Sequence, residues 1–456
     1  MSAEGRSAPS TEGGRVVITG MGAITPSGND VDSLWDSVVT GRSAISVLEG
    51  EQFADLAVRI GGQVSDFDAE AILPLALARR LSPVQHWAIA AADQALAQAG
   101  ITRAGAGAKT GAGAKTGAGA QTDDADAGDL PWDRSRVAVI AATGSGPVDA
   151  MQNATRSLLD AGPRTVPLTL AIHGAPDSAA ALLSQRFDFR GPGQGVSATC
   201  ASGAIGLGEG MRRIRHGYAD AVLVVGMEDC LNPVNLASNA NMRALAAGFE
   251  DDPTSASRPF DSARSGFVMS QGAGAILLES EAGAAARGAT VLAELAGFGA
   301  ASDAHHPTNP HPDGRGAASA MSEALADAGM VPESIDHINA HATGTPAGDA
   351  AELNAFDAAL GATAHSIPIT ATKSSTGHLL GASGVVEAII AIRTMVEQTL
   401  PPTLNLATCE FGGWDIVADQ ARSVPHSEKP IDTVLSTSFG FGGHNGAIIL
   451  RRPRTD

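Results

Sequence analysis

Short apolar runs rich in β-branched residues recur along the chain, separated by helical stretches rich in Ala and Leu. The runs that we expect to be strands are Val16–Thr19, Val137–Ala141, Ala221–Val225, Ala275–Leu278, Asp336–Asn339 and Val434–Thr437. Helical periodicity lies between them, for example over residues 84–99 and over Val385–Val396. Continuous apolar strands that alternate with helices are typical of sheets covered on both faces. The pattern therefore predicts an α/β fold with buried strands.

Two distant segments resemble each other. Gln271–Leu278 reads QGAGAILL and Gly443–Leu450 reads GHNGAIIL, so that in both cases small residues lead into an apolar strand that is followed by charge. The similarity indicates an internal duplication, with a seam near residues 280–290, around Ala282–Gly288.

A low-complexity tract interrupts the first part of the chain. Residues 105–110 read GAGAKT, residues 111–116 repeat them, and an acidic run closes the tract. Such a composition buries too little apolar area to offset the entropy of ordering. We therefore expect a flexible surface insertion near 104–128, and a loose tail over the polar residues 1–14.

The bulk composition narrows the class of protein. At 456 residues the chain can form a large core, and its net charge of −19 argues against a general nucleic-acid binder, although an acidic partner could still meet a local basic patch. Its three cysteines are too few and too scattered for a disulfide framework. No leader peptide and no apolar run long enough to span a bilayer stands out, so we expect a soluble cytoplasmic protein with no membrane partner.

One cysteine has the surroundings of a nucleophile. Cys200 lies in the segment SATCASGA (197–204), at the expected start of a helix. The positive end of a helix dipole stabilises a thiolate, so we expect the pKa of Cys200 to be lowered. Cys230 and Cys409 lack such flanks and are expected to be inert.

Two glycine-flanked histidine motifs follow downstream. His341 begins HATGTP (341–346) directly after an apolar strand, and His378 lies in KSSTGHLLG (373–381), five residues after Lys373. Thiolates attack carbonyls, while imidazoles donate hydrogen bonds to oxyanions or move protons. One cysteine with two histidines therefore indicates acyl-thioester chemistry.

Three other histidines, His305, His306 and His311, lie close together in the sequence. No carboxylate or cysteine completes a recognisable ligand spacing there, so we expect no metal site.

Near the C-terminus, the segment FGFGG (439–443) sets two aromatic residues among glycines. Its backbone can bend sharply and approach a ligand. It is not a phosphate-binding loop, because no strand–GxGxxG–helix unit and no Walker lysine accompanies it.

In their order and local sequence, these motifs resemble the β-ketoacyl-[acyl carrier protein] synthases of type II, the decarboxylating, elongating condensing enzymes of the thiolase superfamily. The resemblance extends from Val16 to Asn445. Two positions depart from the family pattern, since Ala342 replaces the usual Gly and His444 replaces the common Thr.

The resemblance implies a thiolase fold, which is a duplicated α/β/α/β/α five-layered architecture. Residues 15–285 would form the N-terminal half, with the cysteine nucleophile and the insertion, and residues 286–452 the C-terminal half, with both catalytic histidines.

It also implies catalytic roles. Cys200 would carry the acyl chain, and its amide and that of Phe441 would form the oxyanion hole. His341 and His378 would stabilise the enolate formed from the malonyl group. Lys373 would order the site electrostatically, together with Glu387 on the following helix, and Glu387 would also belong to the substrate-binding residues.

Substrate-contacting residues follow from the same resemblance. Thr343 and Thr345 would hydrogen-bond the phosphopantetheine arm, while Phe439 belongs to a gating loop in which the Phe441 ring guards the acyl pocket. Segment 166–177 would line that pocket, where the small side chain of Ala175 leaves room for long acyl chains.

The implied partners are the acyl and malonyl forms of the acyl carrier protein and a second copy of the chain. Arg79, Arg80 and Arg243 stand where relatives carry basic residues that dock the acidic carrier protein. No cofactor is expected beyond the phosphopantetheine that the substrate carries.

Three alternatives compete with fatty-acid elongation. A type II polyketide ketosynthase would use the same Cys-His-His chemistry on a different chain. A biosynthetic thiolase would need a second cysteine near the C-terminal glycine loop, where none lies between Cys409 and Asp456. A non-catalytic chain-length subunit would lack the nucleophile, but Cys200 is present.

Overall fold

The fold is described from a computed structural model, over residues 14–101, 130–425, 427 and 429–453. The predicted insertion at 104–128 lies outside these residues, as does the predicted tail apart from residue 14. The described residues form one large sheet with the strands β1 (Val16–Ile24), β4 (Val137–Ala142), β5 (Gly193–Val196), β6 (Ala221–Asp229), β7 (Gln271–Ser280), β8 (Ala293–Ser302), β9 (His337–Asn339), β10 (Ile369–Thr370), β13 (Thr433–Gly440) and β14 (His444–Arg451). Two small sheets pair β2 (Ile45–Val47) with β3 (Ile60–Gly62) and β11 (Thr399–Leu400) with β12 (Arg422–Ser423).

The strand order repeats the same topology twice. It runs β10-β9-β13-β14-β8 and then β1-β7-β6-β4-β5. In each half, read from its outer edge inward, the first two pairings between neighbouring strands are parallel and the next two are antiparallel. The strands β5-β4-β6-β7-β1 therefore correspond in order to β10-β9-β13-β14-β8. The halves join where Val16–Ile18 pairs antiparallel with Ala293–Leu295. The two segments that resemble each other in sequence form most of β7 and most of β14, which occupy equivalent places in the two halves.

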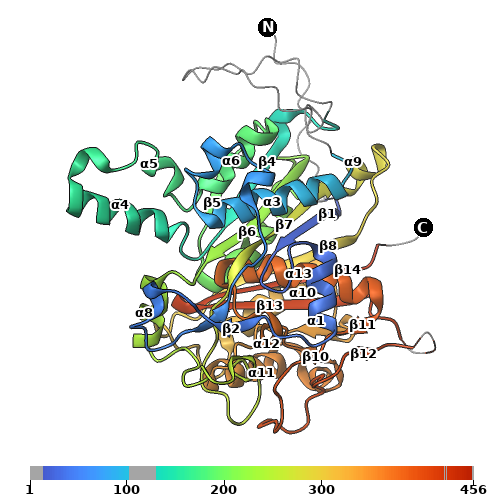
Figure 1. Cartoon of the computed structure of the whole chain (residues 1–456). Coiled ribbons are helices and arrows are strands. Elements are labelled where there is room, and N and C mark those ends of the chain that lie inside the picture. Colours follow the sequence, from blue (N-terminus) through green and yellow to red (C-terminus); the bar gives the residue numbers. More distant parts are fainter. Residues whose placement is uncertain (1–13, 102–129, 426, 428, 454–456) are drawn as a thin grey trace.

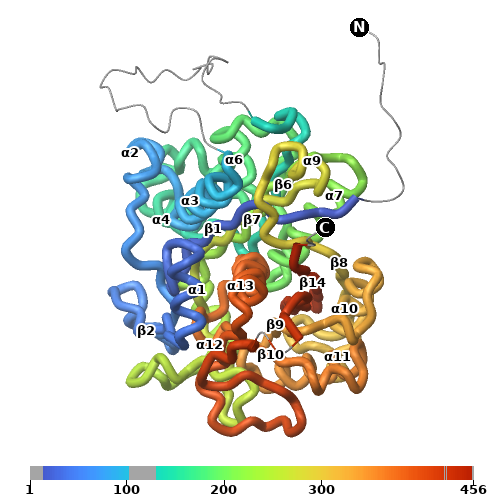
Figure 2. Tube along the Cα trace, turned by 90° about the vertical axis from the view of Figure 1, so that its right-hand side faces the viewer, coloured from blue at the N-terminus to red at the C-terminus, as the bar shows by residue number. Residues whose placement is uncertain are grey.

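Helices cover the outer side of each half and lie between the two halves (Figure 1). They are α1 (Val31–Val39), α2 (Leu75–Ala78), α3 (Pro83–Gln98), α4 (Val148–Ala161), α5 (Leu170–His173), α6 (Ser178–Phe187), α7 (Ser202–Arg215), α8 (Pro233–Asn241), α9 (Glu281–Ala286), α10 (Arg315–Ala328), α11 (Pro346–Leu360), α12 (Lys373–Thr376) and α13 (Ser383–Glu397). Helices α3 and α6 cover the N-terminal half, and α10 and α11 cover the C-terminal half. Helices α7 and α13 contact strands of both halves and lie at the centre of the molecule (Figure 2).

The central helices pack closely because glycines face each other where they cross. A Cβ added to Gly203 on α7 would lie 2.8 Å from the amide nitrogen of Val385 on α13. A Cβ added to Gly384 would lie 2.4 Å from the amide nitrogen of Ala204. Glycine is therefore required on both sides of this crossing, which sets the position of the turn that precedes α7.

The predicted α/β architecture with duplicated halves is confirmed. Each of the six predicted strands is present, and the predicted helices correspond to α3 and α13. The chain passes between its halves through α9, inside the predicted seam at 280–290. The boundary at residue 285 itself stays a prediction. Among the described residues, no helix is both long and apolar enough to cross a membrane.

Candidate active site

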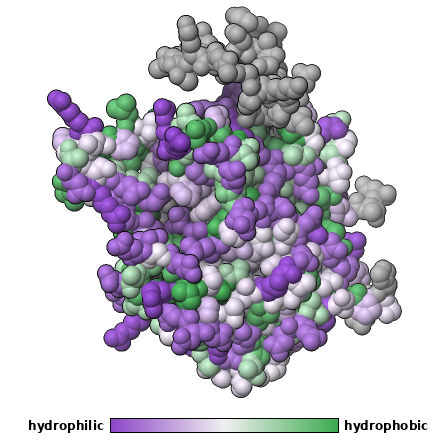
Figure 3. Space-filling model, in the orientation of Figure 1, coloured by the Kyte–Doolittle hydropathy of each residue, from purple (hydrophilic) through white to green (hydrophobic). Residues whose placement is uncertain are grey.

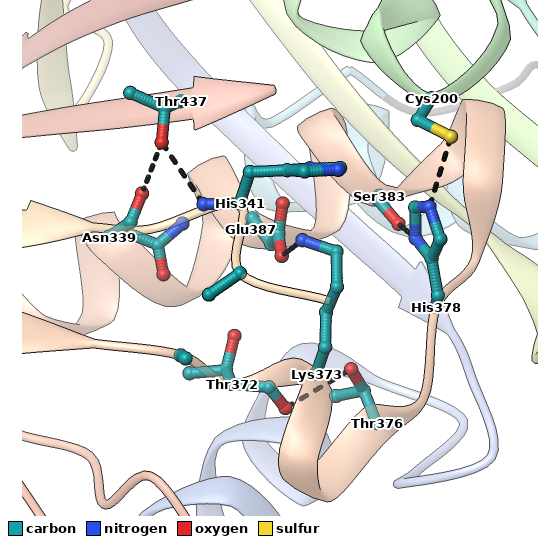
Figure 4. Close-up of polar contacts among 12 residues, drawn as sticks. Cys200, Asn339, His341, Thr372, Lys373, Thr376, His378, Ser383, Glu387 and Thr437 are labelled. Atoms are coloured by element: carbon teal, nitrogen blue, oxygen red, sulfur yellow. Dashed lines mark hydrogen bonds and ion pairs between the residues drawn. The ribbon is translucent and has the colours of Figure 1, made fainter. Parts of the chain in front are cut away.

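A cavity of about 300 Å³ opens where the two halves meet. Cys200, His341 and His378 all line it, although they lie far apart in the sequence. Each comes from a turn that follows a strand or lies between short helical segments, and the three side chains converge (Figure 4). The cysteine and both histidines singled out from the sequence therefore share one site.

Cys200 lies in a short 3-10 turn (Thr199–Ala201) between β5 and α7. Its side chain is buried, with 5% exposure, and its Sγ lies 3.0 Å from His378 Nε2. The amides of Phe441 and of Cys200 itself lie close enough to the sulfur to lower the pKa of the thiol. Two backbone donors are thus close to the sulfur at which a tetrahedral oxyanion would form.

The environment of the thiol differs from the expectation. Burial raises the pKa of Cys200 to about 12, although Lys373 and the amide of Phe441 act in the opposite direction. The expectation of a lowered pKa was wrong, because desolvation of a buried thiolate outweighs the dipole of α7. The thiol is therefore protonated at neutral pH and needs a proton acceptor when it attacks, and His378 Nε2 is within reach.

His378 is fixed on both sides of its ring. Its Nδ1 lies 3.0 Å from Ser383 Oγ, at the start of α13, and its amide donates to the carbonyl of Val268 at 2.8 Å. Because a hydroxyl can donate or accept, Ser383 suits either tautomer of the ring. Burial, followed by the positive charge of Lys373, holds the pKa of His378 well below its usual value, so the ring is neutral.

His341 follows β9, and its backbone is anchored by a buried carboxylate. Glu352 on α11 accepts the amides of His341 and Ala342 at 2.8 and 2.7 Å, while Thr437 Oγ1 accepts the His341 amide at 3.0 Å. Burial, Lys373 and His378 hold the pKa of His341 well below its usual value. Its ring centroid lies 5.4 Å from that of His378, so two neutral imidazoles flank the same space.

Lys373 and Glu387 form a buried ion pair beside these rings (Figure 4). Their side chains are 2% and 3% exposed, and Glu387 Oε2 has no further partner. The predicted pairing is confirmed. Neither Lys373 nor Glu387 lines the cavity, so the pair acts on the two histidines through the charge of Lys373. The predicted role of Glu387 in binding substrate stays a prediction.

The glycine-rich loop after β13 closes over the cysteine. Phe439 and Phe441 both line the cavity. The ring centroid of Phe439 lies 5.7 Å from that of His341. The ring centroid of Phe441 lies 6.2 Å from that of Phe267, and the Phe267 centroid in turn lies 5.4 Å from that of His378. The loop is thus in ring contact with both histidines, directly or through Phe267.

The predicted pantetheine contacts also lie on the cavity. Thr343 and Thr345 line it, with their hydroxyl oxygens 3.1 Å apart. Arg243 lines it too and is exposed, which places a cation at the solvent side of the cavity.

Other predicted residues lie elsewhere. Arg79 and Arg80 are exposed at the end of α2 and do not line the cavity. Ala175 is half-buried between α5 and α6 and does not line it either. The roles of these three residues in docking and chain-length selection stay predictions.

Within the described ranges, no three His, Cys, Asp or Glu side chains gather as a group that could hold a metal ion. His305 and His311 do pack together, with ring centroids 4.9 Å apart, and His311 lines the cavity.

Sequence reasoning missed two buried carboxylates that build the site. Glu352 positions His341, as described above. Glu228, at the end of β6, accepts the amides of Gly144, Ser145 and Gly381 at 2.5, 3.0 and 3.0 Å. An acidic residue inside an otherwise apolar strand, as in VVGMED, was the available signal for Glu228.

Comparison with known proteins agrees with this geometry. A family model described as "Beta-ketoacyl synthase, N-terminal domain" matches residues 14–284, and one described as "Beta-ketoacyl synthase, C-terminal domain" matches residues 292–407. Two proteins named 3-oxoacyl-[acyl-carrier-protein] synthase 2, from Synechocystis sp. and Vibrio cholerae, are each 37% identical to this chain. The matches cover 96% of this chain and 98% and 99% of the two relatives, respectively.

Solved structures agree over the same length. A beta-ketoacyl synthase from Burkholderia phymatum superposes with a TM-score of 0.83 at 31% identity, covering 97% of this chain and 100% of that one. A chain from the structure of a type II polyketide acyl-carrier protein in complex with its ketosynthase superposes with a TM-score of 0.82 at 28% identity. It covers 97% of this chain and 100% of that one. The chain therefore belongs to the beta-ketoacyl synthase family, whose thiolase fold it shares.

Proposed function

We propose that this protein is an acyltransferase that catalyses the decarboxylating Claisen condensation of an acyl thioester with malonyl-[acyl carrier protein]. The product is a β-ketoacyl-[acyl carrier protein]. The observation that carries the proposal is the convergence of a buried thiol and two neutral imidazoles on one cavity beside the Lys373–Glu387 ion pair.

In the loading step, the sulfur of Cys200 attacks the carbonyl carbon of the acyl thioester. The thiol proton passes to His378 Nε2, 3.0 Å away, and then to the departing pantetheine sulfur. The amides of Cys200 and Phe441 stabilise the tetrahedral oxyanion. The acyl group ends as a thioester on Cys200, and the free carrier protein leaves as a thiol.

In the condensation step, the malonyl thioester loses CO₂. The electron pair of the broken C–C bond stays on the thioester and forms an enolate. His341 and His378 each donate one N–H to the enolate oxygen. His378 does so as its Nε2–H tautomer, in which Nδ1 accepts from the Ser383 hydroxyl, and neutral rings suffice for both bonds. The carbanion attacks the acyl carbonyl carbon on Cys200, the C–S bond breaks, and the departing thiolate takes up one proton from solvent water. Because charge develops on that oxygen only during the reaction, these hydrogen bonds favour the transition state over the bound substrate.

The malonyl and acyl groups arrive on the phosphopantetheine arm of the acyl carrier protein, and no other cofactor is required. Thr343 and Thr345 bind the arm along the cavity, and Phe439 borders it. Arg243 at the solvent side, with the exposed Arg79 and Arg80, attracts the acidic carrier protein.

A second copy of the chain is the proposed subunit partner. β5 lies at the edge of the sheet and, within the described residues, pairs only with β4. Beside it, α4 and α5 project from the body as an arm at the left of Figure 1. The arm exposes Leu159, Leu168 and Ile172, and apolar residues are visible at its far left in Figure 3. A free sheet edge and exposed apolar side chains beside it favour a homodimer that covers both.

Fatty-acid elongation is favoured over polyketide synthesis by the identity of the relatives, 37% against 28%. All three cysteines are free, which suits a reducing cytoplasm.

The test of the proposed function supplies two substrates, carrier protein loaded with an acyl group and carrier protein loaded with a malonyl group, with no reductase present. A fatty-acid enzyme extends the chain once and stops, because the next cycle needs a reduced substrate. Repeated extension of the unreduced product would support the polyketide alternative, and absence of both CO₂ release and chain extension would overturn the proposed function.

A further inference from the structure

The peptide group between Phe441 and Gly442 is held at both of its ends. Its carbonyl oxygen, that of Phe441, lies 2.9 Å from the hydroxyl of Thr199. Its N–H, that of Gly442, donates to the carbonyl of Pro307 at 2.7 Å. The two partners come from different halves of the chain, one directly before the nucleophile and one from the loop after β8.

Thr199 is itself in an uncommon backbone conformation. Its φ of +50° lies in the left-handed region, which a β-branched residue rarely adopts. This turn directs the Thr199 side chain toward the glycine-rich loop. A Cβ added to Gly440 would lie 2.1 Å from Thr199 Oγ1 and 3.0 Å from the Cys200 amide nitrogen. The loop and the nucleophile turn are therefore in direct contact.

The peptide that precedes this clamped group carries the Phe441 amide, which lies near Cys200 and lowers the pKa of its thiol. Clamping one peptide restricts the torsions of Phe441 and so restricts the direction of its amide. The Thr199 hydroxyl has a second acceptor, the carbonyl of Ala198 at 2.8 Å, so it could release the loop without being left unpaired.

We propose that Thr199 is a positioning residue, whose hydroxyl clamps the Phe441 carbonyl and thereby aims the Phe441 amide at the oxyanion of the loading step. The proposal rests on the proposed function, since it assumes that Cys200 is acylated. Thr199 does not line the cavity. It acts through the loop, and the loop and the nucleophile turn stay aligned because one side chain joins them.

The matched variants are Thr199→Val, which keeps the branched shape and removes the donor, and Thr199→Ser, which keeps the donor. We expect Thr199→Val to lower the maximal rate of Cys200 acylation by roughly tenfold, with KM for acyl carrier protein unchanged. This is less than the loss of about 10²- to 10³-fold on deleting an oxyanion donor, because the amide is displaced and not removed. Thr199→Ser should restore the rate.

Two further measurements separate positioning from a general structural effect. Malonyl decarboxylation should stay within about twofold of wild type in Thr199→Val, because the histidines serve that step. Hydrogen exchange should increase in peptides that span 439–444 and stay unchanged in those from α7. Should Thr199→Val prove insoluble, Thr199→Ala removes the same donor without adding an atom.

Wild-type acylation rates in Thr199→Val, or an equal loss in Thr199→Ser, would overturn the role of the hydroxyl. A wild-type enzyme that neither loads an acyl group nor condenses would instead overturn the proposed function, so the two failures are distinguishable.

Discussion

Replacement of His341 by Ala should separate the two chemical steps. His341 lines the cavity, and no hydrogen bond joins its ring to Cys200, whereas His378 lies 3.0 Å from the sulfur. The contacts that anchor residue 341 use its amide, through Glu352 and Thr437, so an alanine keeps them. The variant therefore removes one N–H donor from the enolate site and leaves the loop in place.

The magnitude follows from the donor that is lost. A hydrogen bond to a developing oxyanion in a buried site contributes about 3–4 kcal/mol, which corresponds to roughly 10²- to 10³-fold in rate. Malonyl decarboxylation should fall by that factor in His341→Ala. Acyl loading of Cys200 should change by less than about threefold, because no step of the loading reaction uses this ring.

The assay measures the two steps separately in single turnovers. Intact-protein mass spectrometry follows acylation of Cys200, and release of labelled CO₂ from malonyl carrier protein follows decarboxylation. Cys200→Ala is the matched control, since it cannot load but retains both histidines and part of the decarboxylation. His378→Ala should slow both steps. Equal losses of loading and decarboxylation in His341→Ala would refute the assignment of separate duties to the two rings.

Two other predictions concern Asp229 and Ala175. Burial, followed by Asp149 and Glu228, raises the pKa of Asp229 to about 7, so the folded state binds its proton more tightly than the unfolded state and loses stability as pH rises from about 4 to 7. Asp229→Asn should therefore melt above wild type by a larger margin at pH 8 than at pH 5, and an equal offset at both pH values would contradict this origin. Ala175→Phe should shorten the preferred acyl chain and leave short-chain turnover intact, while an unchanged chain-length profile would place Ala175 outside the acyl pocket.

The sequence predicted the strands that carry β-branched residues, but it did not predict β5 and β8. β5 reads GQGV, and β8 contains Gly297 and Gly299. A Cβ at Gly299 would lie 2.0 Å from the carbonyl oxygen of Ala320 on α10. Here the close approach of a helix requires small residues in the strand, although such residues have a low strand propensity. Tertiary packing of this kind leaves no local pattern in the sequence from which the strand could be predicted.

The site could be predicted in its residues but not in its electrostatics. The Cys200, His341 and His378 motifs are contiguous in sequence and were visible. The protonation state of Cys200 depends on burial by segments from both halves, and this reversed the expected direction of its pKa. The Thr199–Phe441 contact joins residues 242 positions apart, so no local motif indicates it.

The central claim is that Cys200 carries the acyl chain during condensation. Its most direct test is peptide-resolved mass spectrometry after incubation with acyl carrier proteins of graded chain length. The account predicts one acyl group per chain, on Cys200 alone, which malonyl carrier protein then removes as a β-ketoacyl product. Acylation of Cys230, of Cys409 or of the Cys200→Ala variant to the same extent would contradict it.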